Sequence, residues 1–134
     1  MLMKDERFFK TIKNFLEIYL LKQKNYSKNT QKSYRESLSL LLQYFKEELG
    51  LGYARIGFDD LTYTNVCGFL DWLTVSRGCS PQTVNLRLMA IRSFAKYSSI
   101  IDPAKIYFQV ELANVPVKKA HGKVVEFMSL PALE

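Results

Sequence analysis

Apolar residues recur every three to four positions in four segments of this chain, and this spacing constrains its fold more than any other feature. The first stripe comprises Phe8, Ile12, Phe15, Leu16, Tyr19 and Leu20, and the second comprises Tyr34, Leu38, Leu41, Leu42, Phe45 and Leu49. The third comprises Val66, Phe69, Leu70 and Leu73, and the fourth comprises Val84, Leu88, Ile91 and Ala95, with Phe94 on its flank. Such a period is typical of helices that bury one face. The sequence therefore predicts an all-α fold, a compact bundle of about four to five helices.

Residues that start or stop helices bound the first three predicted elements. Ser27 is a suitable N-cap for the second helix, and Gly50 and Gly52 stop that helix. The third helix is predicted to start near Thr62 or Thr64 and to end at Arg77-Gly78. The stretch from 52 to 60 between these two helices is predicted to be a loop.

Two serine-proline or aspartate-proline pairs mark the later helices. Ser80-Pro81 predicts the start of the fourth helix, because a proline at the first helical position has no N–H that lacks a partner. Asp102-Pro103 repeats this arrangement and predicts a short fifth helix that reaches only to about Phe108.

The domain organisation changes after this fifth helix. We assign residues 1–112 to one helical domain and residues 113–134 to an extended linker, which holds Pro116, Gly122 and several lysines. Ser129-Leu130-Pro131 resembles another helix start close to the last residue, Glu134. We therefore expect this chain to have been cut from a longer protein.

Charge is distributed unevenly along the chain. The net charge is +6, and neither residues 22–35 nor residues 77–96 contain an acidic side chain although they hold five and four basic ones. Residues 47–71 hold five acids and only one basic residue, Arg55. This sorting predicts a polarised surface with one basic side, which suits a nucleic-acid partner.

Several functional classes find no support in the composition. No apolar run reaches the ~18 residues that a membrane span needs. The single histidine, His121, and the absence of a Cys-x-x-Cys pair exclude a credible zinc site, and no motif calls for another cofactor. Cys67 and Cys79 are expected to be buried thiols rather than a disulfide, which fits a reducing compartment. The aromatic residues at core spacing are expected to pack rather than to stack on bases, and Trp72 to anchor the third helix.

Three segments in a fixed order resemble the N-terminal core-binding, or SAM-like, domain of phage integrases and other tyrosine recombinases. The segments are Tyr26-Ser27-Lys28-Asn29-Thr30 followed by Tyr34 and Leu38, then Ser80-Pro81-Gln82-Thr83-Val84-Asn85-Leu86-Arg87-Leu88 running on to Ile91-Arg92-Ser93-Phe94, then Asp102-Pro103-Ala104 followed by Pro116-Val117-Lys118-Lys119. The resemblance covers residues 8–130. The run from Asn114 to Lys119 looks most like integrases of mobile elements in Bacteroides-type bacteria.

The resemblance implies a role in site-specific DNA integration and recombination. A domain of this family forms half of a clamp around recombination-site DNA, and a catalytic domain closes the other half. Residues 113–134 would then be the linker and the truncated start of that absent catalytic domain. The resemblance further implies a bacterial cytoplasmic protein that is tetrameric on DNA at full length, whereas we expect this fragment to be a monomer.

The residues themselves indicate which side chains would contact double-stranded DNA. On the second helix Lys28, Lys32 and Arg35 lie four and three positions apart, so they form one strip suited to phosphates. Around them and on the fourth helix and the linker, the further candidates are Asn29, Thr30, Gln82, Thr83, Arg87, Arg92, Lys96, Lys118 and Lys119. Gln and Arg near a helix start are able to read base edges. For Thr83 a local cap and for Arg87 a structural salt bridge are equally good alternatives.

Catalysis is not expected of this chain. The family cuts DNA with a tyrosine assisted by arginines, a lysine and a His-x-x-Arg motif, and no His-x-x-Arg occurs in the sequence. None of the eight tyrosines has the cluster of cations that would stabilise a phosphoryl transition state. The alternative functional class is a helical protein–protein interaction module with an incidental basic face. A helix-turn-helix factor is disfavoured, because the loop from Gly50 to Asp60 is too long for its tight turn.

Overall fold

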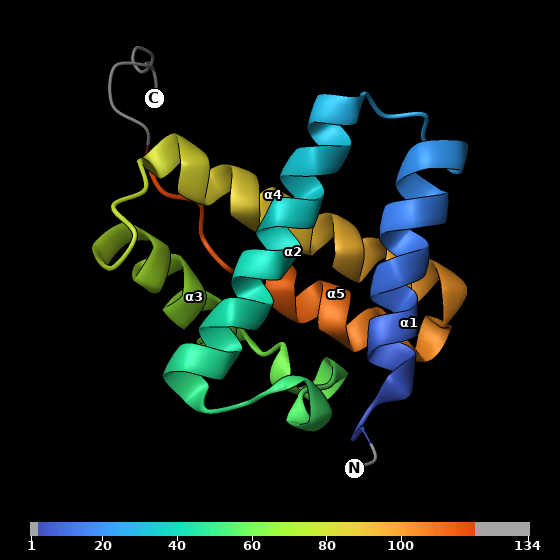
Figure 1. Cartoon of the computed structure of the whole chain (residues 1–134), viewed down its shortest axis with the longest axis horizontal. Helices are drawn as coiled ribbons and strands as arrows, with labels where there is room; N and C mark the ends of the chain where they lie inside the picture. The colour runs from blue at the N-terminus through green and yellow to red at the C-terminus, as the bar shows by residue number, and fades with distance from the viewer. Residues whose placement is uncertain (1–2, 120–134) are drawn as a thin grey trace.

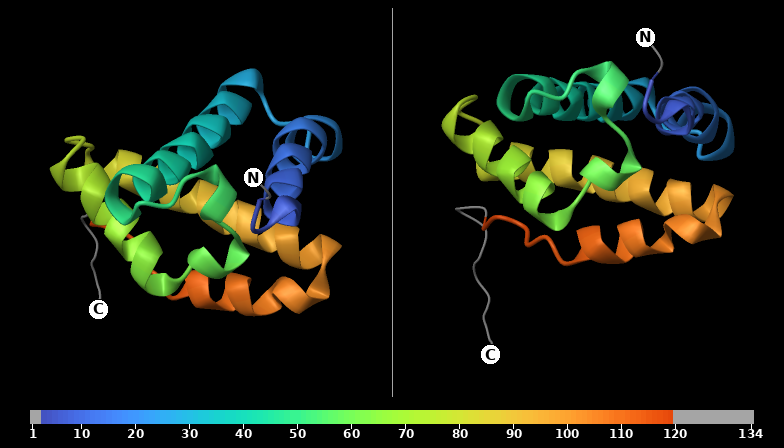
Figure 2. Two further views of the ribbon diagram at one scale, coloured as in Figure 1. Left: turned by 60° about the horizontal axis from the view of Figure 1, so that its bottom comes forward. Right: turned by 90° about the horizontal axis from the view of Figure 1, so that it is seen from below.

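The computed structural model describes residues 3–119 and confirms the all-α fold (Figure 1). The helices are α1 (Glu6–Asn14), the π-helix η1 (Phe15–Gln23), α2 (Lys28–Leu49), α3 (Tyr63–Val75), α4 (Pro81–Ile101) and α5 (Ile106–Ala113). Three short 3-10 turns join them, η2 (Tyr53–Arg55), η3 (Phe58–Asp60) and η4 (Pro103–Lys105). Seen from below, α4 lies between the α1/α2 side of the molecule and α5 (Figure 2). His121 and the helix start predicted at Ser129 lie outside the described residues.

The first predicted helix is continuous in space but changes its winding at Phe15. The sequence predicted one α-helical stripe through Leu20, whereas residues from Phe15 onward form a π-helix. Phe15 and Leu20 are both fully buried and lie five positions apart, which is the spacing that i→i+5 winding places on one face. Leu16 and Tyr19, which the α-helical stripe included, are only partly buried.

The predicted starts of α2, α3 and α4 are confirmed by their capping hydrogen bonds. The hydroxyl oxygens of Ser27, Thr62 and Ser80 accept the N–H groups three residues on, at 3.2, 3.1 and 3.2 Å. Each bond satisfies one N–H that the first turn leaves without a helical partner. Gly50, after α2, and Gly78, after α3, adopt left-handed φ angles of 68° and 66°, a conformation that costs glycine little.

The fifth helix was predicted too short, and the loop predicted between α2 and α3 contains two short turns. The fifth helix does not stop near Phe108 but reaches Ala113, because Leu112 is needed in the core and is fully buried. The predicted loop at 52–60 contains η2 and η3, and these turns bury Ile56 and Phe58. A single apolar residue in or beside a short turn has no helical period, so the spacing of apolar residues could not reveal η2 or η3.

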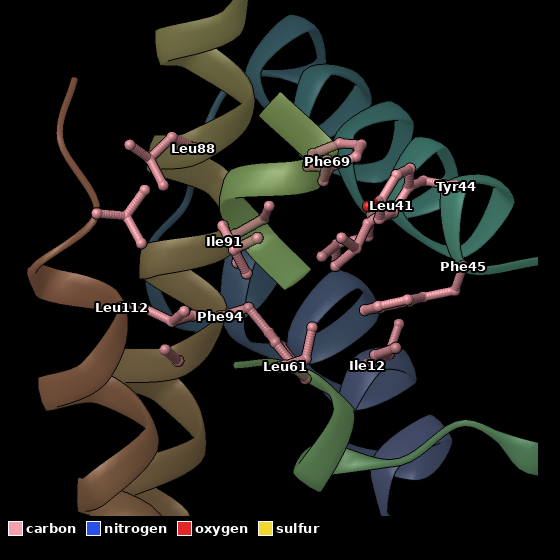
Figure 3. Close-up of a cluster of buried hydrophobic side chains, with 14 of the residues drawn as sticks. Ile12, Leu41, Tyr44, Phe45, Leu61, Phe69, Leu88, Ile91, Phe94 and Leu112 are labelled. Carbon is pink, nitrogen blue, oxygen red and sulfur yellow. The ribbon is translucent and has the colours of Figure 1, made fainter. Parts of the chain in front are cut away.

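Phe94 on α4 is at the centre of the aromatic core. Its ring lies 5.5 to 6.3 Å from those of Phe8, Phe15, Phe58 and Phe108, which come from four different elements. The sequence placed Phe94 on the flank of its stripe, but its side chain is fully buried. Figure 3 shows Phe94, Ile91 and Leu88 along α4, in the same buried cluster as Leu61. The predicted role of the aromatic residues in packing agrees with this arrangement.

A second cluster joins α2 to α3 through Trp72, Tyr44 and Phe69. The Trp72 ring centroid lies 5.6 Å from that of Tyr44, and the Arg77 guanidinium lies 5.4 Å from the Trp72 ring.

Cys67 and Cys79 are half-buried free thiols. In residues 3–119 no helix is long and apolar enough to cross a membrane, and no cluster of potential metal ligands is found.

Candidate nucleic-acid interface

The N-terminal half of α2 presents the predicted basic strip. Lys28, Lys32 and Arg35 are all exposed, and none of them makes a salt bridge with any residue in 3–119. Of the three acids of this helix, Glu36 directly follows Arg35 and lies 3.9 Å from Arg87, whereas Glu47 and Glu48 lie near the other end. The free N–H groups at a helix start add a partial positive charge to the same end. This half of α2 is therefore the more cationic half.

The first turn of α2 and the first turn of α4 are built alike. In α2, Thr30 accepts a hydrogen bond from the Ser27 hydroxyl at 3.0 Å, and in α4, Thr83 accepts one from the Ser80 hydroxyl at 3.1 Å. Asn29 and Gln82, one residue before each threonine, are exposed. The contacts of Thr83 are those of the local-cap alternative, while Gln82 is free to reach a ligand.

Arg87 connects α4 to α2. Its Nη1 donates to the Ser33 carbonyl at 3.3 Å and to the Ser37 hydroxyl at 3.2 Å, and its Nη2 lies 3.9 Å from the Glu36 carboxylate. The Arg87 side chain is only 16% exposed. These contacts correspond to the structural alternative for Arg87. They also bring the two acid-free segments together at the crossing of the helices.

Arg92 belongs to α4, and its side chain reaches the C-terminal end of α5. Its Nε donates to the Leu112 carbonyl at 3.4 Å and its Nη2 donates to the carbonyls of Ala113 and Val115. Carbonyls at a helix C-terminus lack helical partners, and a cation there is favourable. Arg92 therefore fixes the chain where it leaves α5, whereas Lys96, one turn further along α4, is exposed.

Two of the residues that follow α5, Val115 and Lys118, pack against or bond to the helices. We name residues 114–118 the exit segment; within it Val115 is fully buried. The Asn85 side chain donates to the Lys118 carbonyl and accepts from the Lys118 N–H, both at 2.8 Å. The Lys118 ammonium lies 3.3 Å from the Asp71 carboxylate, and Lys119 is exposed. The sequence reasoning missed Asn85, because no spacing rule relates it to a partner 33 residues away.

The structure thus separates the predicted contact residues into two sets. The first set is exposed and consists of Lys28, Asn29, Lys32, Arg35, Gln82, Lys96 and Lys119. The second set makes the local or interhelical contacts described above and consists of Thr30, Thr83, Arg87, Arg92 and Lys118. The exposed set is what an approaching polyanion would meet first.

Comparison with known proteins identifies the family that this chain resembles. Residues 12–99 match the family described as "Phage integrase, N-terminal SAM-like domain". The chain is 30% identical over 118 residues to "Putative integrase/recombinase y4rD" of Sinorhizobium fredii, and the match covers 88% of this chain and 42% of that protein. It is 28% identical over 123 residues to "Putative integrase/recombinase y4rC" of the same organism, covering 92% of this chain and 37% of that protein. The chain thus spans about two fifths of the length of these relatives. No solved structure matches it.

Proposed function

Because this chain belongs to the phage integrase family through the N-terminal SAM-like domain, we propose that it binds double-stranded DNA with the first halves of α2 and α4. Its recombinase-related role would then be to hold and position recombination-site DNA. Phosphate contacts set the register of such a complex, and a few polar contacts add sequence preference.

One observation carries this proposal: the exposed cations of α2 have no acidic partners and lie on the helix that Arg87 ties to α4. Glu36 is the acid nearest the strip, and its carboxylate lies 3.9 Å from the Arg87 guanidinium. Three exposed cations that make no salt bridge in residues 3–119, beside this single acid, favour a polyanionic partner. Gln82 at the start of α4 adds an exposed side chain able to hydrogen-bond a base edge.

We assign DNA cleavage to the catalytic domain of the full-length protein. In this proposal the exit segment leads towards that domain, which completes the clamp, and the full-length protein assembles as a tetramer on DNA. The present chain, acting alone, binds as a monomer. Its dissociation constant is expected to be about 10⁻⁴ to 10⁻⁶ M, the range of non-specific binding.

The test compares two double variants that remove the same charge. Lys28→Gln/Lys32→Gln changes the strip, and Lys10→Gln/Lys46→Gln removes two exposed lysines in the middle of α1 and near the end of α2. With a generic duplex at low salt, the strip variant is expected to bind about tenfold more weakly or worse, on any sequence. The control pair is expected to bind nearly as wild type does. Equal affinity for wild type and the strip variant would refute the assignment of α2.

A second candidate function is a helical protein-interaction module, and one observation favours it. Leu86 and Met89 on α4 are 53% and 54% exposed, and Val110 on α5 is 59% exposed. Met89 also lines a hollow of about 380 Å³ between α4 and α5. A chain that binds no duplex even at low salt would favour this candidate over DNA binding.

A further inference from the structure

A polar hollow of about 100 Å³ lies between the end of η1 and α4. Two of its lining residues are lysines, three carry hydroxyl groups and none is acidic; they are Tyr19, Leu20, Lys24, Tyr26, Ser93 and Lys96. Lys24 and Tyr26 belong to one acid-free segment, and Ser93 and Lys96 belong to the other. The hollow is therefore the place where both segments face a common space.

The turn after η1 shapes one wall of the hollow. Asn25 has a left-handed φ of 52°, a conformation that asparagine tolerates better than most residues. On either side of it the Lys24 N–H donates to the Tyr19 carbonyl at 2.8 Å and the Tyr26 N–H donates to the Leu20 carbonyl at 3.0 Å. These bonds hold the backbone from which Lys24 and Tyr26 project.

Helix α4 supplies the other wall. The Ser93 hydroxyl lies 3.4 Å from the Tyr34 hydroxyl of α2, which fixes it beside the crossing of the two helices. Lys96 follows three positions later on the same helix and is exposed. The Lys24 ammonium lies 5.9 Å from the Tyr19 ring centroid, and neither lysine makes a salt bridge with any residue in 3–119.

We propose that this hollow binds one phosphoryl group, a backbone phosphate of duplex DNA, between Lys24 and Lys96. This inference rests on the proposed function and adds a contact beside the strip of α2. A lysine from each wall and three hydroxyl-bearing side chains in the lining match the charge and the several acceptor oxygens of a phosphodiester. Such an anchor would fix the DNA at the turn between η1 and α2 and so set its register along α2.

The test measures the salt dependence of binding to a generic duplex of about thirty base pairs for wild type and two double variants. Lys24→Gln/Lys96→Gln removes both ammonium groups of the hollow, and Lys10→Gln/Lys46→Gln is the control of equal charge. Circular dichroism and thermal unfolding of each variant establish that it is folded.

If both lysines hold one phosphate, the hollow variant loses about 0.9 from the slope of log K against log salt, and its low-salt affinity falls about tenfold. The control variant keeps the wild-type slope. An equal, small loss in both variants overturns the hollow while DNA binding stands. A slope loss of about 1.8 shows two separate phosphate contacts and overturns the shared site. Absence of DNA binding by wild type overturns the proposed function and this inference with it.

A free phosphoryl ligand is another source of the same chemistry, and a second arm distinguishes it. Thermal unfolding is measured with pyrophosphate and with sodium chloride at equal ionic strength. Stabilisation of wild type by pyrophosphate that the hollow variant lacks, together with unchanged DNA affinity in that variant, would overturn the assignment to DNA.

Discussion

The side-chain amide of Asn85 pairs with both backbone groups of Lys118: it donates to the carbonyl and accepts from the N–H, each at 2.8 Å. This pair fixes the exit segment against α4 at one end, and Arg92 fixes the end of α5 at the other. The direction in which the chain leaves the helical domain is therefore set by two residues of α4. In the proposed clamp this would restrict where a following domain lies.

Replacing Asn85 by alanine is expected to release the exit segment. Two part-buried hydrogen bonds contribute roughly 1–2 kcal/mol together, so the open state becomes about five- to thirtyfold more populated. Limited trypsin digestion measures this as faster cleavage after Lys118 and Lys119. Asn29→Ala, at an exposed position on α2, is the control and keeps the wild-type rate. An unchanged rate in Asn85→Ala would mean that the pair does not hold the segment.

The elements that rest on local chemistry were predictable from the sequence. Ser27 and Ser80 act on N–H groups three residues away, so their role follows from a short stretch of chain. Thr62 was one of two predicted starts for α3, and the structure selects it. The apolar periods of α2, α3 and α4 likewise gave the buried faces, because each is a property of one helix.

What the sequence could not give depends on how the helices cross. Arg87 was left between a DNA contact and a salt bridge, since its partners Ser33 and Ser37 lie more than one helix away in the chain. Arg92 and Lys118 were predicted as DNA contacts, and their partners within the fold were missed for the same reason. The π-helical winding from Phe15 was missed, because a five-residue spacing between two buried residues is hidden within a denser apolar run.

Arg87→Met is expected to lower the free energy of unfolding by roughly 1–3 kcal/mol, because the Ser37 hydroxyl and the Ser33 carbonyl lose a charged donor. Urea unfolding measures the loss, and Arg55→Met at an exposed position serves as the control. Under conditions where Arg87→Met is folded, its DNA binding should keep the wild-type salt slope. A slope about 0.9 smaller with unchanged stability would instead identify Arg87 as a phosphate contact.

Gly68 allows the close approach of α3 to Tyr44. A Cβ at this position would clash with the Tyr44 hydroxyl oxygen, and the Tyr44 side chain is too buried to move freely. Gly68→Ala alone is therefore expected to destabilise the chain by roughly 1–3 kcal/mol. In a Tyr44→Phe background the clash is removed, and the same change should stabilise by up to about 1 kcal/mol through helix propensity. Thermal unfolding of the four proteins gives the cycle, and additive effects would contradict the predicted clash.

Burial of Tyr97 is expected to lower the free energy of unfolding at alkaline pH. Burial, and to a lesser extent the neighbouring Tyr19, raises the pKa of Tyr97 above its usual value, so the folded state favours the neutral phenol. This contribution is complete below the unfolded-state pKa of about 10 and is lost as pH rises through the folded-state pKa. Urea unfolding at about pH 9 and about pH 11 should show a smaller decrease for Tyr97→Phe than for wild type. Tyr53→Phe, at a ring that is 60% exposed, should decrease as wild type does, and equal decreases in all three would exclude this role for Tyr97.

The most direct test of DNA binding is fluorescence anisotropy of the wild-type chain with a labelled duplex of about thirty base pairs at several salt concentrations. We expect binding that weakens steeply with salt, with a slope that corresponds to about three to six phosphate contacts at ~0.9 each. Absence of binding at low salt, or binding that does not change with salt, would contradict the account and leave the integrase resemblance as a description of the fold alone.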